Sequence, residues 1–345
     1  MEPSRLPQHP APSASRGAGT VRPVETSAPA REVEIHPAEL AERLITNVTA
    51  VMRVPPALLS RVVVCLLAEG HLILEDVPGV GKTKLAKALA ASLDIGFRRL
   101  QFTPDLLPTD VTGVNVFDQA NRAFTFRPGP VFTSILLVDE INRAGPKTQS
   151  ALLECMEERQ VTIDGQTRHL PRPFMVIATQ NPIEYEGTYP LPEAQLDRFA
   201  MRLSLGYPSA EEEVRMLADH GTRDPLDDVQ PIGGAETVLA AIDACRQVHV
   251  EPSVNRYVVA LLGRTRHDER LLLGASPRSG ISLIRLAKAA ALLDGRDYVM
   301  PDDVKQLAPT ALAHRLILSP EARARGMEAA DVVEDVLART PVPVM

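Results

Sequence analysis

The sequence contains no tryptophan, and only 4% of its 345 residues are aromatic. Few side chains can therefore stack on nucleic-acid bases, and the composition favours aliphatic α/β or helical packing. The chain also lacks a positive charge balance, since its net charge at pH 7 is −7. A protein that held duplex phosphates over its whole surface would be basic. Both features argue against nucleic acid as the partner.

Cysteine is scarce as well, with Cys65, Cys155 and Cys245 lying far apart in apolar or helical contexts. An odd number at this spacing argues against a disulfide or zinc framework and predicts buried thiols in a reducing compartment. No uncharged apolar run reaches about 18 residues, and the N-terminus lacks the charged-then-apolar pattern of a signal peptide. We therefore expect a cytoplasmic chain with no membrane span.

What is present divides into three parts. Residues 1–34 are rich in Pro, Ala, Ser and Arg without a hydrophobic period, which predicts a disordered tail. Residues 35–207 alternate between apolar strands and helices, which predicts a parallel sheet with helices on both faces. The predicted strands are 71–75, 97–102, 134–138, 174–179 and 200–205. Residues 208–345 carry helical patterns alone, at about 209–218, 235–247, 253–265, 280–294, 302–315 and 326–338.

Two segments within the first of these domains have strand-like alternation bounded by glycine or proline. Segments 111–127 and 159–172 each contain a polar turn between apolar positions, so both are interpreted as β-hairpin insertions. A projecting hairpin can contact a substrate or a neighbouring subunit. A plain edge hairpin is equally compatible with the pattern.

The sequence VPGVGKT at residues 77–83 lies between a predicted strand and a predicted helix. Its glycines let the backbone approach an anion, Lys82 can reach the β- and γ-phosphates, and Thr83 offers a hydroxyl to Mg²⁺. The general pattern has glycine where this chain has Asp76, and aspartate tolerates unusual backbone angles better than most residues. The predicted phosphate-binding residues are Pro78, Gly79, Val80, Gly81, Lys82, Thr83 and Lys84.

A second motif ends the apolar run at residues 135–138 with Asp139 and Glu140. Carboxylates at the C-terminal end of a buried parallel strand emerge at the edge of the sheet where such folds bind ligands. Asp139 is placed to hold Mg²⁺, together with Thr83. Glu140 is placed to polarise a water that attacks the triphosphate.

Six further stretches occur in a specific order: residues 74–83, 138–144, 151–160, 178–182, 191–199 and 274–278. Together they resemble the MoxR family of AAA+ ATPases over about residues 37–340. The resemblance implies an α/β AAA+ core with a five-stranded parallel sheet, an all-helical C-terminal lid, ATP and Mg²⁺ as cofactors, and insertions at the two predicted hairpins. It also implies that an acid or glycine at position 76 is ordinary.

The resemblance assigns roles to four more polar residues. Asn181 resembles the first sensor, which orients the attacking water, and Arg278 resembles the second sensor, which couples the lid to the γ-phosphate. Arg198 resembles an arginine finger supplied to the nucleotide of the neighbouring subunit. Arg143 resembles a position that faces an adjacent subunit, although it could equally anchor a loop. With Glu140, the first three form the predicted catalytic set.

One departure from the family pattern affects the base rather than the phosphates. Relatives have Val-Gly-Gln in the adenine pocket, where this chain has Val54, Pro55 and Pro56. Proline removes two backbone donors there. ATP remains the predicted nucleotide because the rest of the pocket pattern is intact.

The resulting hypothesis is a Mg²⁺-dependent ATPase that works as a homo-oligomeric ring, with a hexamer expected. The resemblance implies chaperone-like remodelling of client proteins, often with a partner that carries a von Willebrand factor A domain. Two alternatives stay open. One is a nucleotide-gated scaffold without useful turnover, which Glu140 argues against. The other is a DNA-remodelling motor that uses one of the hairpins as its tool.

Overall fold

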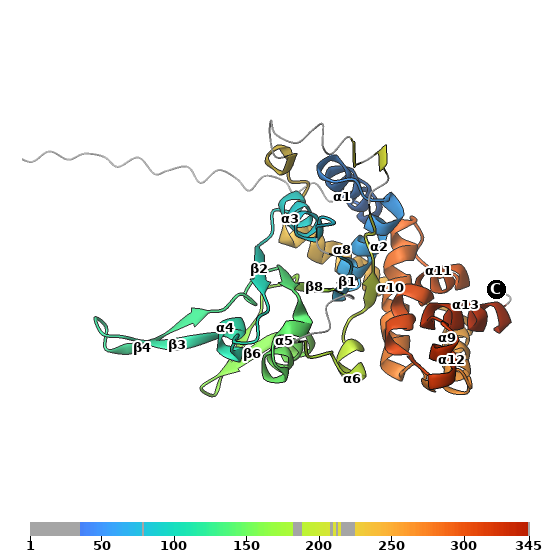
Figure 1. Ribbon diagram of the computed structural model, residues 1–345. Helices are drawn as coiled ribbons and strands as arrows, with labels where there is room; N and C mark the ends of the chain where they lie inside the picture. Colours follow the sequence, from blue (N-terminus) through green and yellow to red (C-terminus); the bar gives the residue numbers. More distant parts are fainter. Residues whose placement is uncertain are drawn as a thin grey trace, which may run out of the picture. The chain divides into compact units, whose positions relative to one another are not determined.

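The computed structural model describes residues 35–343, apart from residues 78, 182–187, 208–209, 212 and 215–224. Its centre is a five-stranded parallel sheet in the order β2-β5-β8-β1-β9 (Figure 1). The strands are β1 (Leu72–Glu75), β2 (Phe97–Gln101), β5 (Ile135–Asp139), β8 (Met175–Gln180) and β9 (Met201–Leu203). Each lies within two residues of its predicted bounds. The predicted five-stranded parallel sheet is therefore confirmed.

The central strands are apolar without alternation because helices cover both faces of the sheet. Side chains at Leu72, Leu74 and Leu137 enter one core, and those at Ile73 and Leu136 enter the other. The helices in this part of the chain are α1 (Pro37–Val51), α2 (Pro56–Leu67), α3 (Lys82–Ser92), α4 (Pro108–Thr112), α5 (Pro146–Glu158) and α6 (Glu193–Leu196), with the 3₁₀ turns Ile141–Arg143 and Pro225–Asp228.

Two antiparallel hairpins interrupt the alternation of strands and helices. Strand β3 (Gly113–Asp118) pairs with β4 (Ala123–Pro128), and β6 (Gln160–Ile163) pairs with β7 (Gln166–His169). Asp164 and Gly165 both have positive φ, as a two-residue hairpin turn requires. The β3–β4 hairpin extends away from the sheet in Figure 1, and it carries the exposed rings of Phe117 and Phe124 with centroids 5.3 Å apart.

The C-terminal part is mainly helical, but it is not helical throughout. Its helices are α8 (Ala235–Gln247), α9 (Pro252–Arg266), α10 (Pro277–Leu293), α11 (Pro301–Leu312), α12 (Pro320–Ala324) and α13 (Ala329–Arg339), with the 3₁₀ turn Ala313–Arg315. Strands β10 (Leu271–Leu273) and β11 (Ile317–Leu318) form a small antiparallel pair, so the expectation of helices alone is wrong. Runs of two or three apolar residues are too short to show a period. The helix expected at 209–218 lies mostly outside the described residues.

The three cysteines have the buried, unpaired state that their number and spacing predict. Cys65, Cys155 and Cys245 are buried and free, and burial raises the pKa of each thiol to about 12. Such thiols stay protonated at neutral pH and are poor nucleophiles. Within the described ranges, no helix combines the length and the apolar character needed to cross a bilayer.

Two buried histidines link the sheet to its surroundings and predict how stability depends on pH. His71 donates from Nε2 to the Met156 carbonyl, and His314 does the same to the Phe199 carbonyl. Burial lowers the pKa of His71 to about 4 and that of His314 to about 3, from 6.5. The neutral histidines therefore contribute their full stabilisation of the folded state above pH 6.5. This contribution is lost as the pH falls toward 4 for His71 and toward 3 for His314. The free energy of unfolding should fall by about 2 to 3 kcal/mol per pH unit between pH 6 and pH 5.

Urea unfolding of the full chain at several pH values measures this slope. His314→Gln keeps an amide donor for the Phe199 carbonyl but removes one titrating group, so it should flatten the slope by about half. The same change at His249, whose side chain is 62% exposed, serves as the control. An unchanged slope in His314→Gln would contradict the assignment.

Candidate active site

The loop that follows β1 has the backbone shape of an anion cradle. Gly79 and Gly81 have φ values of +91° and +95°, in the left-handed region that favours glycine. Gly81 precedes α3, which begins at Lys82, so free N–H groups of the first helical turn face the loop. Pro78 lies outside the described residues. The described part of the loop can hold a phosphate at the helix N-terminus.

Asp76, where the general pattern has glycine, does not use the backbone freedom that we expected of it. Its φ is not positive. Its buried carboxylate instead accepts hydrogen bonds from Ser204 Oγ (2.6 Å), the Leu205 N–H (2.8 Å) and the Gly206 N–H (3.0 Å). Asp76 therefore ties the start of the loop to the segment after β9.

Lys82 lies among carboxylates at the C-terminal edge of the sheet. Its Nζ donates to the Asp76 carbonyl at 2.5 Å. Burial lowers the pKa of Lys82, while the negative charges of Asp76, Asp139, Glu140 and Glu75 act in the opposite direction. The structure thus brings the lysine of the loop together with the acidic pair, as the two motifs predict.

Asp139 is the last residue of β5 and is almost fully buried. Its carboxylate pairs with Arg99 Nε at 2.6 Å and accepts a hydrogen bond from Thr179 Oγ1 at 3.3 Å. Arg99 lies on the neighbouring strand β2, and Thr179 lies on β8. The carboxylate is therefore held in place by the strands on both sides of it.

Glu140 leaves the strand with a φ of +54°, which turns it into the 3₁₀ turn that follows. Its Oε2 accepts from Gln101 Nε2 at 2.7 Å and from Arg143 NH1 at 3.1 Å. Its N–H donates to Thr179 Oγ1 at 3.0 Å. Arg143 thus contacts the candidate base of its own chain. The Glu140 carboxylate contacts Gln101 and Arg143, whereas the Asp139 carboxylate contacts Arg99 and Thr179. Separate partners suit a base that acts apart from a metal ligand.

Asn181 enters the same edge of the sheet. It follows β8 directly, and β8 lies between β1 and β5 in parallel register, with Glu75 opposite Gln180 and Val138 opposite Ala178. The carboxyl ends of these three strands therefore carry the phosphate loop, the acidic pair and Asn181. The role of Asn181 in orienting water stays a prediction.

The residues at this edge fit Mg²⁺ and a triphosphate. The Thr83 hydroxyl and the Asp139 carboxylate are hard oxygen ligands, and Val80, Thr83 and Lys84 are half-buried around the helix start. The described residues contain no group of three or more His, Cys, Asp or Glu that could hold a metal ion. Mg²⁺ here would need phosphate oxygens and water to complete its ligand shell, which is how it is commonly bound beside nucleotides.

The turn between α1 and α2 lies beside the phosphate loop. A Cβ atom on Gly81 would meet Met52 Cε at 3.2 Å. Pro55 precedes α2, its carbonyl accepts the N–H groups of Leu58 and Leu59, and Pro56 is the first residue of the helix. Helix starts leave their first N–H groups unbonded, so neither proline removes a helical hydrogen bond.

The two predicted catalytic arginines lie together, around one carboxylate. Arg198 Nε is 3.0 Å from Glu157 Oε2, and Arg278 NH2 is 2.8 Å from Glu157 Oε1. Glu157 lies near the C-terminal end of α5, Arg198 follows α6, and Arg278 lies in the first turn of α10. Two segments 80 residues apart in sequence therefore present their guanidinium groups at one place.

Asp197 holds the start of α10 beside Arg198. Its carboxylate accepts hydrogen bonds from Ser276 Oγ at 2.9 Å and from Ser279 Oγ at 3.0 Å. Ser276 is the N-cap of α10, where a carboxylate also benefits from the helix dipole. This contact fixes the position of Arg278 relative to Arg198.

The arginine pair lies at the opposite edge of the sheet from Lys82. Met156, next to Glu157, accepts a hydrogen bond from His71, which directly precedes β1. The Ala200 N–H, two residues beyond Arg198, donates to the His71 carbonyl at 2.8 Å. The four residues of β1 span about 13 Å and separate this edge from the phosphate loop. In Figure 1, α3 lies above the sheet and α6 below it.

Several contact residues were given no role by the sequence analysis. Gln101 and Thr179 hold the acidic pair, Glu157 pairs with both arginines, and Asp197 holds the start of α10. Gln101 is the last residue of β2 and Thr179 the second-last of β8, the two strands on either side of β5, so strand order could have located them. Glu157 and Asp197 depend on a chain fold that no local spacing reveals.

The comparisons with known proteins agree with this geometry. The model of the ATPase family associated with various cellular activities (AAA) matches residues 71–201, and that of the AAA lid domain matches residues 263–336. A crystal structure of a protein from Cytophaga hutchinsonii superimposes with a TM-score of 0.82 at 39% identity, over 90% of this chain and 97% of that one.

Two curated relatives match along most of their length. The uncharacterized protein YeaC of Bacillus subtilis is 47% identical over 317 residues, which cover 91% of this chain and 98% of the relative. Chaperone MoxR1 of Mycobacterium tuberculosis is 42% identical over 311 residues, which cover 88% of this chain and 82% of the relative. Identity at this level over this length is enough to assign a family.

Proposed function

This chain belongs to the MoxR family of AAA ATPases, and from that premise we propose that it hydrolyses ATP with Mg²⁺ in a homo-oligomeric ring. The observation that carries the proposal is the division of the site between two edges of one sheet. Lys82, Asp139 and Glu140 lie at one edge, while Arg198 and Arg278 lie at the other. A protomer cannot apply its own arginines to its own phosphates without rearrangement, but a neighbour in a ring can supply them.

The residues at the carboxyl edge have separate roles in binding phosphate, holding Mg²⁺ and accepting a proton. Lys82 and the N–H groups at the start of α3 bind and orient the phosphates, and Thr83 with Asp139 would hold the Mg²⁺ ion. Mg²⁺ would neutralise charge that develops on the phosphate oxygens. Glu140 accepts the proton of the attacking water, and Asn181 orients that water. Gln101 orients the Glu140 carboxylate through a hydrogen bond.

The arginine edge completes the site of the adjacent subunit. We assign Arg198 as the arginine finger, which stabilises negative charge on the transferring phosphoryl group. We assign Arg278 to the same neighbouring site, since it shares the Glu157 carboxylate with Arg198. A heterologous contact of this kind repeats from subunit to subunit and forms a ring where the rotation between subunits closes, and we expect six subunits.

The task of the ring is proposed to be the remodelling of client proteins. One relative is named a chaperone. The β3–β4 hairpin exposes the aromatic pair Phe117 and Phe124, and exposed aromatic side chains are a means of holding protein segments. A partner with a von Willebrand factor A domain belongs to the same proposal. The net charge of −7 favours a protein client over a nucleic acid.

Assembly and turnover should rise together with protein concentration. If the arginines come from a neighbour, dilute protomers have incomplete sites, and phosphate release per protomer should increase as rings form. Light scattering with Mg²⁺ and a non-hydrolysable ATP analogue should give a mass of about six times the 37.5 kDa chain. Full specific activity in a solution that scattering shows to be monomeric would contradict the composite site.

A further inference from the structure

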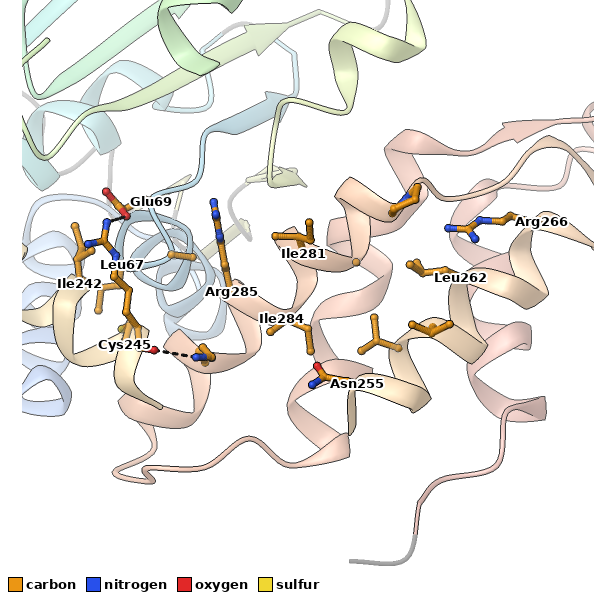
Figure 2. A pocket seen from close by; sticks show the side chains of 17 residues that line it. Leu67, Glu69, Ile242, Cys245, Asn255, Leu262, Arg266, Ile281, Ile284 and Arg285 are labelled. Carbon is orange, nitrogen blue, oxygen red and sulfur yellow. Dashed lines mark hydrogen bonds and ion pairs between the residues drawn. The ribbon is translucent and has the colours of Figure 1, made fainter. Parts of the chain in front are cut away.

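A groove with an apolar floor lies between α2 and α8 on one side and α9 and α10 on the other. It encloses about 750 Å³. Figure 2 shows its length: Ile242 and Cys245 lie at one end, Leu262 and Arg266 at the other, and Ile281 and Ile284 between them. It is separate from the residues that would bind nucleotide, none of which lines it.

The floor leaves large apolar side chains in contact with solvent. Val259 is 65% exposed and Ile281 is 59% exposed, although both lie in well-packed helices. Along α9 the lining residues recur three or four apart, at Asn255, Val259 and Leu262, and a similar face of α10 carries Ile281 and Ile284. A pair of helix faces with this spacing forms the kind of surface that accepts a third helix.

Gly280 determines how closely the two helices approach. A Cβ atom at this position would lie 2.7 Å from Leu262 Cδ1, too close for any real contact. The glycine thus lets α10 touch α9 along the groove, which keeps the floor continuous.

The charges around the groove are mainly positive. Arg266, Arg285 and Lys288 line it, and none has a carboxylate partner among the residues that the structure describes; Arg266 and Lys288 donate to backbone carbonyls. Its one acidic lining residue, Glu69, is already shared by Arg159, Arg172 and Arg246. Burial alone would raise the pKa of Glu69, but hydrogen bonds from Arg159 and Arg246 outweigh it and lower the pKa to about 2. The groove therefore presents uncompensated positive charge.

We propose that this groove binds an acidic amphipathic helix of a partner protein, with apolar side chains on the floor and carboxylates facing Arg266, Arg285 and Lys288. The cations are spread along the groove instead of converging on one point, which suits a helix better than a small molecule. The groove shares no residue with the phosphate loop or the acidic pair, although Glu69, Ile281 and Arg285 also line the pocket that contains Arg198 and Arg278. Binding of a partner helix is measured without ATP, so the proposal does not depend on turnover.

Fluorescence anisotropy with the full chain tests the proposal. The probe is a labelled synthetic helix of about four turns, with leucines on one face and glutamates on the others. Val259→Asp should weaken its binding by at least about tenfold, since it puts a charge on the apolar floor. Lys288→Glu should weaken it by about threefold or more at low salt and less at high salt. Leu272→Asp is the matched control, because Leu272 lies outside the groove and is about as exposed as Val259.

Several results would overturn the proposal. Equal binding to Val259→Asp and Leu272→Asp would show that the floor is not used. If a probe with lysines in place of glutamates binds equally well, the partner helix need not be acidic, and that part of the proposal is wrong. A fall in oligomer mass of Val259→Asp without probe would assign the groove to a second copy of this chain. Displacement of the probe by a peptide of residues 1–34 would assign it to the chain's own N-terminal segment.

Discussion

Glu140→Gln is expected to reduce ATP turnover by about 10² to 10⁴-fold and to leave ATP binding nearly unchanged. The amide keeps the size of the side chain and one acceptor oxygen, so contacts with Gln101 and Arg143 can persist. It cannot take the proton of the attacking water. Phosphate release measures the loss, and binding of a fluorescent ATP analogue checks that the pocket is intact.

Glu154→Gln makes the same chemical change at an exposed position of α5 and serves as the control. Turnover that stays normal in Glu140→Gln would disprove the assignment of the base. A wild-type chain that binds ATP without releasing phosphate would instead support the alternative of a nucleotide-gated scaffold. The two results are distinguishable because only the second concerns the unmodified protein.

The sequence predicts the sheet and its carboxyl edge well because both depend on local patterns. The run at residues 135–138 is apolar throughout, and a central strand buried on both faces requires this. Parallel strands place their carboxyl ends at one edge, so Lys82 and Asp139 could be brought together without knowledge of the full fold. The strand bounds followed from the same runs.

Other features depend on contacts between segments that are distant in sequence. Glu157 lies on an ordinary helix face, and only the approach of the segment after α6 and of the first turn of α10 makes it the partner of two arginines. The reason expected for Asp76 was backbone freedom, whereas the structure shows three hydrogen bonds to a segment about 130 residues away. The β10–β11 pair was missed because it is formed by two very short runs.

The ATP turnover lost in Arg198→Ala should be restored when this variant is mixed with Glu140→Gln, which is itself inactive. Arg198→Ala alone is expected to lose about 10²-fold or more in turnover, because the guanidinium assigned as the finger then no longer stabilises the neighbouring phosphoryl group. A protomer with Glu140→Gln still carries Arg198, and a protomer with Arg198→Ala still carries Glu140. In a random equal mixture, about a quarter of the interfaces join an intact base to an intact finger. Phosphate release from the mixture should therefore far exceed that of either variant alone.

The same experiment with Arg278→Ala decides which site that arginine serves. If Arg278 acts on the neighbour, as its contact with Glu157 beside Arg198 indicates, mixing with Glu140→Gln should also restore turnover. If it acts on its own nucleotide, every protomer with an intact Glu140 lacks Arg278, and no interface recovers. Arg323→Ala, which alters an exposed arginine on α12, should be fully active both alone and in mixtures. If mixing restores turnover with Arg198→Ala but not with Arg278→Ala, Arg198 acts on the neighbouring subunit and Arg278 acts on the nucleotide of its own subunit.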